Sequence, residues 1–202
     1  MMQSKPGERR KTKTRQDIIN TAYDLIIERG LEAVSLRAVA DHMDYSPAAL
    51  YRYFSSKDEL VDAVRAKCFE HLNAAIFQRL HGVSSPARML LVGGMTYIHF
   101  AREHPVEYHL MFHLGPSPST QAENQKLAMR SLLYIVRHGI ELGIFAADAN
   151  YTEDAIVLHC WSTVHGLAML QTTVMDEEQA RMAEVTETIL GRVIASFTRI
   201  PA

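Results

Sequence analysis

The sequence predicts an all-α protein of about nine helices, with a three-helix N-terminal helix-turn-helix domain ahead of a larger helical domain. Three observations support this prediction. Apolar residues recur at helical spacing along most of the chain, helix-capping residues precede most of these segments, and no segment carries strand signals. Apolar residues make up 48% of the 202 residues, which is enough for a packed core.

The first helix is predicted from Thr14 to the residue before Gly30, which acts as a C-terminal stop. One of its faces is apolar, with Ile18, Ala22, Leu25 and Ile26. Residues 1–13 have no such periodicity and carry five basic side chains, so we expect a flexible basic arm over about residues 1–11. This arm is either a solvated tail or an extension that reaches DNA phosphates.

The next three helices follow closely. Ser35 caps a helix that turns Leu36, Val39 and Ala40 inward, and residues 43–45 make a turn. Ser46-Pro47 opens a third helix, Pro47–Phe54, with a capping hydroxyl and a proline at the first helical position. A capping box from Ser56 to Glu59 then opens a longer helix that ends near His81.

This arrangement is typical of a helix-turn-helix over about residues 35–54, in which the second helix enters the DNA major groove. Leu50 and Phe54 lie four residues apart and face the small core, which leaves the remaining positions of the helix for DNA. Small alanines let the backbone approach the bases, tyrosine hydroxyls reach phosphates, and Lys57 sits at a helix start that attracts anions. The alternative is an ordinary helical hairpin with its aromatic residues in the core.

The run AALYRYFSSKDEL, preceded by SLRAVA and DIINTAYDLIIERG, resembles the N-terminal domain of TetR/AcrR-family transcriptional regulators. The resemblance covers about residues 12–72, the predicted DNA-binding domain, and implies a dimeric, all-helical regulator, in most members a repressor released by a small ligand. Asp44-Tyr45 stands where the family usually has glycine and a hydrophobic residue. Together, the residue pattern and the resemblance give the candidate DNA contacts Ser35, Arg37, Ser46, Ala48, Ala49, Tyr51, Arg52, Tyr53 and Lys57.

The second half, residues 73–202, is predicted to be the effector-binding and dimerisation domain. Ser85-Pro86 opens a helix that ends before His104-Pro105, and a short helix follows through Phe112. A loop is expected at residues 115–118. Three further helices are predicted over about residues 120–142, 152–173 and 177–198, of which the last follows an Asp176 to Gln179 box.

The sequence around Trp161 and His165 is similar to a TetR subgroup whose effector domain is named for a Trp-His-Gly motif. These two side chains lie four residues apart and therefore share a helical face, and Gly166 beside them permits close approach. An apolar site with a few polar groups is the usual make-up of a small-molecule pocket. The candidate pocket residues are Tyr97, Phe100, Tyr108, Met111, Phe112, Tyr134, Trp161, His165 and Met169; a well-packed core with a hydrogen-bonded histidine is the alternative.

The last two helices have apolar residues on more than one face, so one stripe suits the core and another a partner. We therefore expect a homodimer through these helices, bound to a roughly palindromic stretch of double-stranded DNA, with plain core burial as the alternative. Charge agrees with this, because residues 1–57 hold ten Lys and Arg against seven Asp and Glu, while the net charge of the chain is -2.

Other classes of protein are disfavoured. The sequence shows no nucleophile elbow, phosphate-binding loop or paired acids, so no enzyme and no cofactor are predicted. His109 and His113 share helical spacing but no carboxylate is placed beside them, so no metal site is predicted either. Two cysteines, no signal-peptide core and no membrane-length apolar stretch indicate a soluble cytoplasmic protein. A DNA-binding regulator without an effector, or less plausibly a helical enzyme or scaffold, remains the alternative function.

Overall fold

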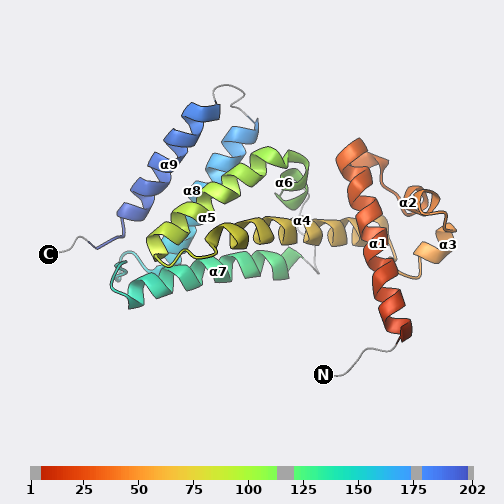
Figure 1. The fold of residues 1–202 in the computed structure, drawn as a ribbon, viewed down its shortest axis with the longest axis horizontal. Helices are drawn as coiled ribbons and strands as arrows, with labels where there is room; N and C mark the ends of the chain where they lie inside the picture. Colours follow the sequence, from red (N-terminus) through yellow and green to blue (C-terminus); the bar gives the residue numbers. More distant parts are fainter. Residues whose placement is uncertain (1–5, 113–120, 174–178, 200–202) are drawn as a thin grey trace. The chain divides into compact units, whose positions relative to one another are not determined.

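The structure of the chain is a computed structural model that describes residues 6–112, 121–173 and 179–199. These residues form nine α-helices and one short 3₁₀ helix, and the sole β-type pairing among them is an isolated bridge between Phe145 and Thr198. The predicted all-α fold is therefore confirmed (Figure 1). The chain divides into two compact units, residues 1–68 with 109–122 and residues 69–108 with 123–202, and each unit is described by itself.

The first unit contains the helix-turn-helix. Its elements in chain order are α1 (Pro6–Arg29), η1 (Leu31–Ala33), α2 (Leu36–His42), α3 (Pro47–Leu50) and the beginning of α4 (Lys57–Leu80). The predicted apolar face of α1 is buried, and α1 packs against α2, which packs against α3. Side chains from all four α-helices close the core, among them Ile18, Ile26, Val39, Leu50, Phe54, Leu60 and Val64.

Two predicted boundaries in this unit are wrong. The first helix begins at Pro6 rather than Thr14, because Pro6 suits a first turn and the charged residues after it are good helix formers. Residues 6–11 of the expected flexible arm are therefore helical, and residues 1–5 lie outside the described part of the chain. The regular part of α3 ends at Leu50 rather than Phe54. Beyond it the N–H groups of Arg52 and Tyr53 donate to carbonyls three residues back, which tightens the turn.

Within the described residues, helix caps form at Ser35, Ser85 and Thr152, and the cap predicted at Ser46 does not. The Ser35 hydroxyl accepts a hydrogen bond from the Ala38 N–H at 3.0 Å, and the Ser85 and Thr152 hydroxyls accept from Arg88 and Ala155 in the same manner. The Ser46 hydroxyl, predicted to cap α3, makes no capping hydrogen bond, and Pro47 alone opens this helix.

The second unit is a bundle of longer helices. It contains the end of α4, α5 (Pro86–Glu103), the start of α6 (Pro105–Phe112), α7 (Gln121–Glu141), α8 (Glu153–Thr173) and α9 (Gln179–Ala195). Helices α5, α8 and α9 lie side by side (Figure 1). The core between the helices is formed by Leu90, Val136, Phe145, Ile156, Val157, Cys160, Ile194 and Phe197. The expected loop at 115–118 and Asp176 lie outside the described residues.

Two glycines in this bundle are positions of close approach. A methyl group at Gly94 would stand 3.0 Å from Leu190 Cδ1 and 3.2 Å from Val164 Cγ2, so α5 packs tightly on α8 and α9 there. The neighbouring Gly93 has space around it. In α7, a methyl group at Gly139 would overlap the ring of the fully buried Phe145. The chain reaches Phe145 through Gly143, whose φ of +70° ends α7 as predicted.

The two cysteines are buried thiols, one in each unit. Cys68 lies in α4 and is fully buried, and Cys160 lies in α8 and is 7% exposed. Burial raises the pKa of the Cys160 thiol to about 11. Among the described helices, none is both long and apolar enough to cross a membrane.

Candidate nucleic-acid interface and His165 cluster

The turn between α2 and α3 is made by a residue in an uncommon backbone conformation. Asp44 has a φ of 54°, the left-handed region that side chains other than glycine adopt at a cost. The N–H groups on either side close the turn, since Met43 donates to the Val39 carbonyl at 3.1 Å and Tyr45 donates to the Ala40 carbonyl at 2.9 Å. The turn thus keeps its geometry although aspartate stands where glycine would be expected.

The candidate DNA contacts are all at least partly exposed to solvent, whereas Leu50 and Phe54 among them are buried. Leu50 is 0% exposed and Phe54 is 1% exposed, whereas Tyr51 between them is 61% exposed. Of the nine predicted contacts, six are exposed and three are half-buried. The exposed ones are Ser35, Arg37, Ser46, Ala48, Tyr51 and Arg52, and the half-buried ones are Ala49, Tyr53 and Lys57. None of the nine is in the core.

The connection from α3 to α4 is fixed by a compact set of hydrogen bonds. The N–H and the hydroxyl of Ser55 both donate to Glu59 Oε2 at 2.7 Å, and the Glu59 N–H donates to Ser56 Oγ at 3.1 Å. These bonds from Ser55 hold the pKa of Glu59 below its usual value, so the carboxylate stays ionised. Lys57 is the first residue of α4, where the backbone N–H groups of the first turn are oriented toward the helix start.

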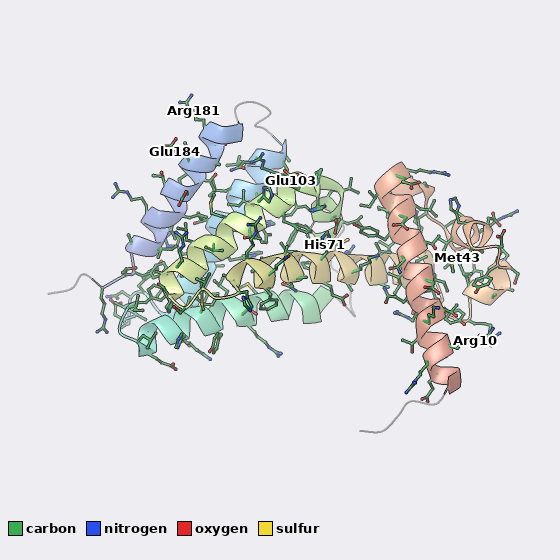
Figure 2. The ribbon with its side chains drawn as sticks, in the orientation of Figure 1. Arg10, Met43, His71, Glu103, Arg181 and Glu184 are labelled. Atoms are coloured by element: carbon green, nitrogen blue, oxygen red, sulfur yellow. The ribbon has the colours of Figure 1, made fainter. Side chains whose placement is uncertain are left out.

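Two features of this surface were missed by the sequence reasoning. Tyr45 is 45% exposed in the turn directly before α3, and an aromatic residue in the turn was the available signal. The basic residues of the expected arm lie on the regular helix α1, where Arg9, Arg10, Lys11 and Lys13 are all exposed (Figure 2 labels Arg10). They are therefore held by a helix rather than carried on a loose tail.

In the second unit, three polar groups meet inside the helical bundle. His165 Nδ1 on α8 lies 3.0 Å from the Tyr97 hydroxyl on α5 and 2.9 Å from the Tyr108 hydroxyl on α6. The Trp161 ring stacks on the His165 ring with centroids 5.1 Å apart. We call these four residues the His165 cluster.

The two phenols of the cluster are buried, while Trp161 and His165 are half-buried. Tyr97 is 9% exposed and Tyr108 is 2% exposed. Burial is the main cause that raises the pKa of Tyr97 far above its usual value and the pKa of Tyr108 to about 12. Both phenols therefore remain neutral and can donate or accept hydrogen bonds at physiological pH. If one of the two hydroxyls donates to His165 Nδ1, the ring proton is on Nε2; otherwise Nδ1 carries the proton and donates to a hydroxyl.

The remaining predicted pocket residues are distributed over both compact units. The Phe100 ring contacts His71 and His104, and Met169 lies one turn beyond His165 on α8. Tyr134 is 67% exposed and stacks on His138, so in the single chain it is a surface side chain. Met111 and Phe112 belong to the other compact unit, where Met111 is buried and Phe112 is half-buried.

A second set of ionisable residues lies in the same unit and was not assembled by the sequence reasoning. His71 on α4, His104 and Glu107 have possible metal-ligand atoms within 4.8 Å of one another. The spacing of His104 and Glu107 was visible in the sequence, but nothing there places His71 beside them because it lies 33 positions upstream of His104.

The last two helices expose part of their apolar surface. Ile156, Cys160, Leu190 and Ile194 are buried, while a second stripe on the same helices is 36–56% exposed; it consists of Leu158, Leu170, Val185 and Ile189. A methyl group added at Gly166 or Gly191 would meet no other side chain within 4 Å. These two helices thus carry one stripe for the core and one that the single chain leaves uncovered.

Comparisons with known proteins agree with this geometry. Residues 18–64 match the family model "Bacterial regulatory proteins, tetR family", and residues 90–174 match "Tetracyclin repressor-like, C-terminal domain". The chain is 37% identical over 60 residues to the uncharacterised HTH-type transcriptional regulator YdeS of Bacillus subtilis, which is 30% of each chain. It is 32% identical over 97 residues to the HTH-type transcriptional repressor KstR of Mycolicibacterium smegmatis.

The KstR match covers 48% of this chain and 43% of KstR, so these two curated relatives are each matched over less than half of their length. A solved structure of a Rhodococcus protein of unknown function has the same fold along nearly the whole chain. Its TM-score is 0.79 at 23% identity, with 92% of this chain and 95% of that chain covered.

Proposed function

The chain belongs to the TetR family of bacterial regulatory proteins, and from that premise we propose that it is a DNA-binding transcriptional repressor released by a small molecule. The observation that carries the proposal is the exposed surface around α3, where Tyr51 stands in solvent next to the buried Leu50 and Phe54. The burial of Leu50 and Phe54 fixes the backbone of Tyr51, so the exposed Tyr51 side chain is presented at a defined position. A side chain held in this way suits a specific contact with DNA.

The roles of the individual residues follow from their chemistry. Ala48 and Ala49 lack polar groups and allow close approach to base edges, including thymine methyl groups. Tyr51, Tyr53 and the Ser35 and Ser46 hydroxyls donate to phosphates, and Arg37 and Arg52 add charge. Lys57 acts together with the N–H groups at the start of α4, which is a favourable place for a phosphate. We keep the predicted division into a DNA-binding domain of residues 12–72 and an effector and dimerisation domain of residues 73–202.

We propose that the protein works as a homodimer. A dimer places two recognition helices in successive major grooves, about 34–36 Å apart, and so reads a roughly palindromic site. The uncovered stripe on α8 and α9, with Leu158, Leu170, Val185 and Ile189, supports a two-fold interface of these helices with their copies. Apolar surface of this kind is usually covered by a partner.

We propose that the effector binds at the His165 cluster. Two neutral phenols and an imidazole among apolar side chains offer hydrogen bonds to a small, partly apolar molecule. Such a molecule releases the DNA only if it binds one dimer geometry more tightly than the other, with a coupling of about 1–3 kcal/mol.

The DNA-binding proposal is tested by affinity for genomic sites recovered with the purified protein, measured across a salt series. Lys57→Ala should weaken binding to all sequences about tenfold and reduce the salt slope by about one. Tyr51→Phe removes one hydroxyl and should weaken binding severalfold, about 0.5–1.5 kcal/mol. Tyr134→Phe, equally exposed but in the other unit, is the matched control. Wild-type affinity in both Lys57→Ala and Tyr51→Phe would remove these residues from the interface.

The effector proposal is tested separately by thermal-shift screening of metabolites. A true effector raises the melting temperature of the wild type and lowers its DNA affinity, and both responses are lost in Trp161→Ala. If DNA binding is specific but no compound produces both responses, the protein is a regulator without an effector.

A further inference from the structure

A group of three side chains with the chemistry of metal ligands lies apart from the His165 cluster. His71 projects from α4, His104 directly precedes α6, and Glu107 lies in the first turn of α6 (Figure 2 labels His71). His71 Nδ1 is 3.1 Å from Glu107 Oε1 and 3.0 Å from Oε2, and His104 Nδ1 is 3.2 Å from Oε1. Both imidazoles therefore direct the same ring nitrogen to one carboxylate.

These distances suit a metal ion as well as a hydrogen bond. Zinc binds imidazole nitrogen and carboxylate oxygen at about 2.0–2.2 Å, so neighbouring ligand atoms in a tetrahedral site stand about 3.3 Å apart. The two nitrogen–oxygen pairs are already at 3.0–3.2 Å. The ligand atoms of all three residues lie within 4.8 Å of one another, so modest rotations of the two rings bring them around a single ion.

The burial of these three side chains also favours a metal site. The Glu107 side chain is 1% exposed, whereas the His71 and His104 side chains are 46% and 39% exposed. A buried carboxylate is costly unless it is paired or coordinates a metal, and the two half-open rings give an ion a path from solvent. The Phe100 ring lies against both imidazoles, at centroid distances of 5.1 and 4.6 Å, and so restricts their orientation.

The position of Glu107 in α6 is not explained by helix capping. A glutamate at the third helical residue commonly accepts a hydrogen bond from the N–H of the capping residue. Here the capping residue is His104, and its N–H donates to the Phe100 carbonyl at 2.8 Å. The Glu107 carboxylate is directed to the two imidazoles instead.

We propose that His71, His104 and Glu107 form a binding site for one divalent first-row transition-metal ion of the zinc type. Two imidazoles and a carboxylate suit Zn²⁺, Co²⁺, Ni²⁺ and Fe²⁺ far better than Ca²⁺ or Mg²⁺, which prefer oxygen ligands. Three protein ligands leave a coordination position for water or for a donor atom of a small molecule. The site lies entirely within the second unit and does not depend on the proposed DNA or effector functions.

The test uses the full, untagged chain after treatment with a chelator. Co²⁺ is added while its visible absorption is followed, Zn²⁺ is used to displace it, and calorimetry gives the stoichiometry. We expect one ion per chain, with affinity reduced at least tenfold in His71→Ala and in Glu107→Gln. His99→Ala removes another exposed histidine, on α5, and should leave the affinity unchanged.

A second readout separates the metal site from a purely structural contact between these side chains. Zn²⁺ should raise the melting temperature of the wild type increasingly as the free Zn²⁺ concentration exceeds its dissociation constant, but should not raise that of His71→Ala. If Glu107→Gln does not fold without metal, His71→Ala, whose ring is half-exposed, decides the question. The proposal is overturned if no saturable binding occurs, if binding survives His71→Ala, or if His99→Ala reduces it equally.

Discussion

The helix-turn-helix surface and the His165 cluster are built in opposite ways. The nine candidate DNA contacts lie within a span of 23 residues, Ser35 to Lys57, and their side chains are exposed or half-buried. In the cluster, Tyr97 lies 68 positions and Tyr108 lies 57 positions before His165 in the sequence. Both phenols are nearly inaccessible to solvent. One site is a surface of a local segment, and the other exists only when three helices are packed.

This difference implies that substitutions in the two regions have different consequences. A change on the helix-turn-helix surface should alter DNA affinity and leave the free energy of unfolding nearly unchanged. A change inside the bundle should alter the free energy of unfolding and leave DNA affinity unchanged in the absence of an effector.

The largest loss of stability is expected for Gly139→Ala. Its new methyl group would overlap the buried Phe145 ring, and overpacking of this kind costs about 3 kcal/mol. Gly93→Ala is the matched control, since it lies in the middle of α5 with space around it. Urea unfolding should show the large loss for Gly139→Ala alone. Equal stabilities of the two variants would contradict the tight packing at the end of α7.

Tyr108→Phe should have the next largest effect. The variant removes the hydroxyl that meets His165 Nδ1 while keeping the buried ring, which lowers the free energy of unfolding by about 1 kcal/mol. DNA affinity without effector should stay at the wild-type value. If Tyr108→Phe lowered DNA affinity without lowering the free energy of unfolding, it would contradict the expected difference between the two regions.

Glu59→Gln tests the junction of α3 and α4 through its pH dependence. Because hydrogen bonds from Ser55 lower the pKa of Glu59 in the folded chain, its contribution is complete above its ordinary value of about 4.3. That contribution is lost as the pH falls through the lowered value. We expect the variant to be less stable than wild type by about 0.5–1 kcal/mol at pH 7, a modest amount because the group is exposed. A gap that persists at a pH low enough to protonate Glu59 in the folded chain would contradict this explanation.

The smallest effect is expected at the turn. Asp44 adopts a φ of 54°, which glycine accepts more readily, so Asp44→Gly should raise the free energy of unfolding by up to about 0.5 kcal/mol. Asp44→Val should lower it, because a β-branched residue is strained at positive φ. Chemical denaturation of both variants measures the sign, and destabilisation by glycine would argue for a specific role of the Asp44 side chain.

The same contrast explains what could be predicted from the sequence. The all-α fold was predictable because helical periodicity and caps such as Ser35 and Ser85 act within a few residues of the chain. Two helix boundaries were predicted wrongly. The first helix begins at Pro6, because the polar residues there form a helix without an apolar face. Helix α3 ends before Phe54, because Arg52 and Tyr53 donate hydrogen bonds to carbonyls three residues back.

Sites that combine distant segments were predicted only in part. Trp161 and His165 were recognised as a pair because one helical turn separates them, and Tyr97 and Tyr108 were named as candidates. The exposed position of Tyr134 and the meeting of His71 with Glu107 follow from how helices pack against one another. No periodicity within a single segment carries that information.

The placement of one buried thiol in each unit gives the molecule two internal reporters of opening. A thiol buried away from solvent reacts slowly with alkylating reagents, and reaction requires the surrounding helices to separate. Modification of Cys68 therefore measures fluctuations of the first unit, and modification of Cys160 measures those of the second unit. Mass spectrometry of the peptides that contain Cys68 and Cys160 would give the alkylation rate of each thiol, and thus the opening of each unit, in a single experiment.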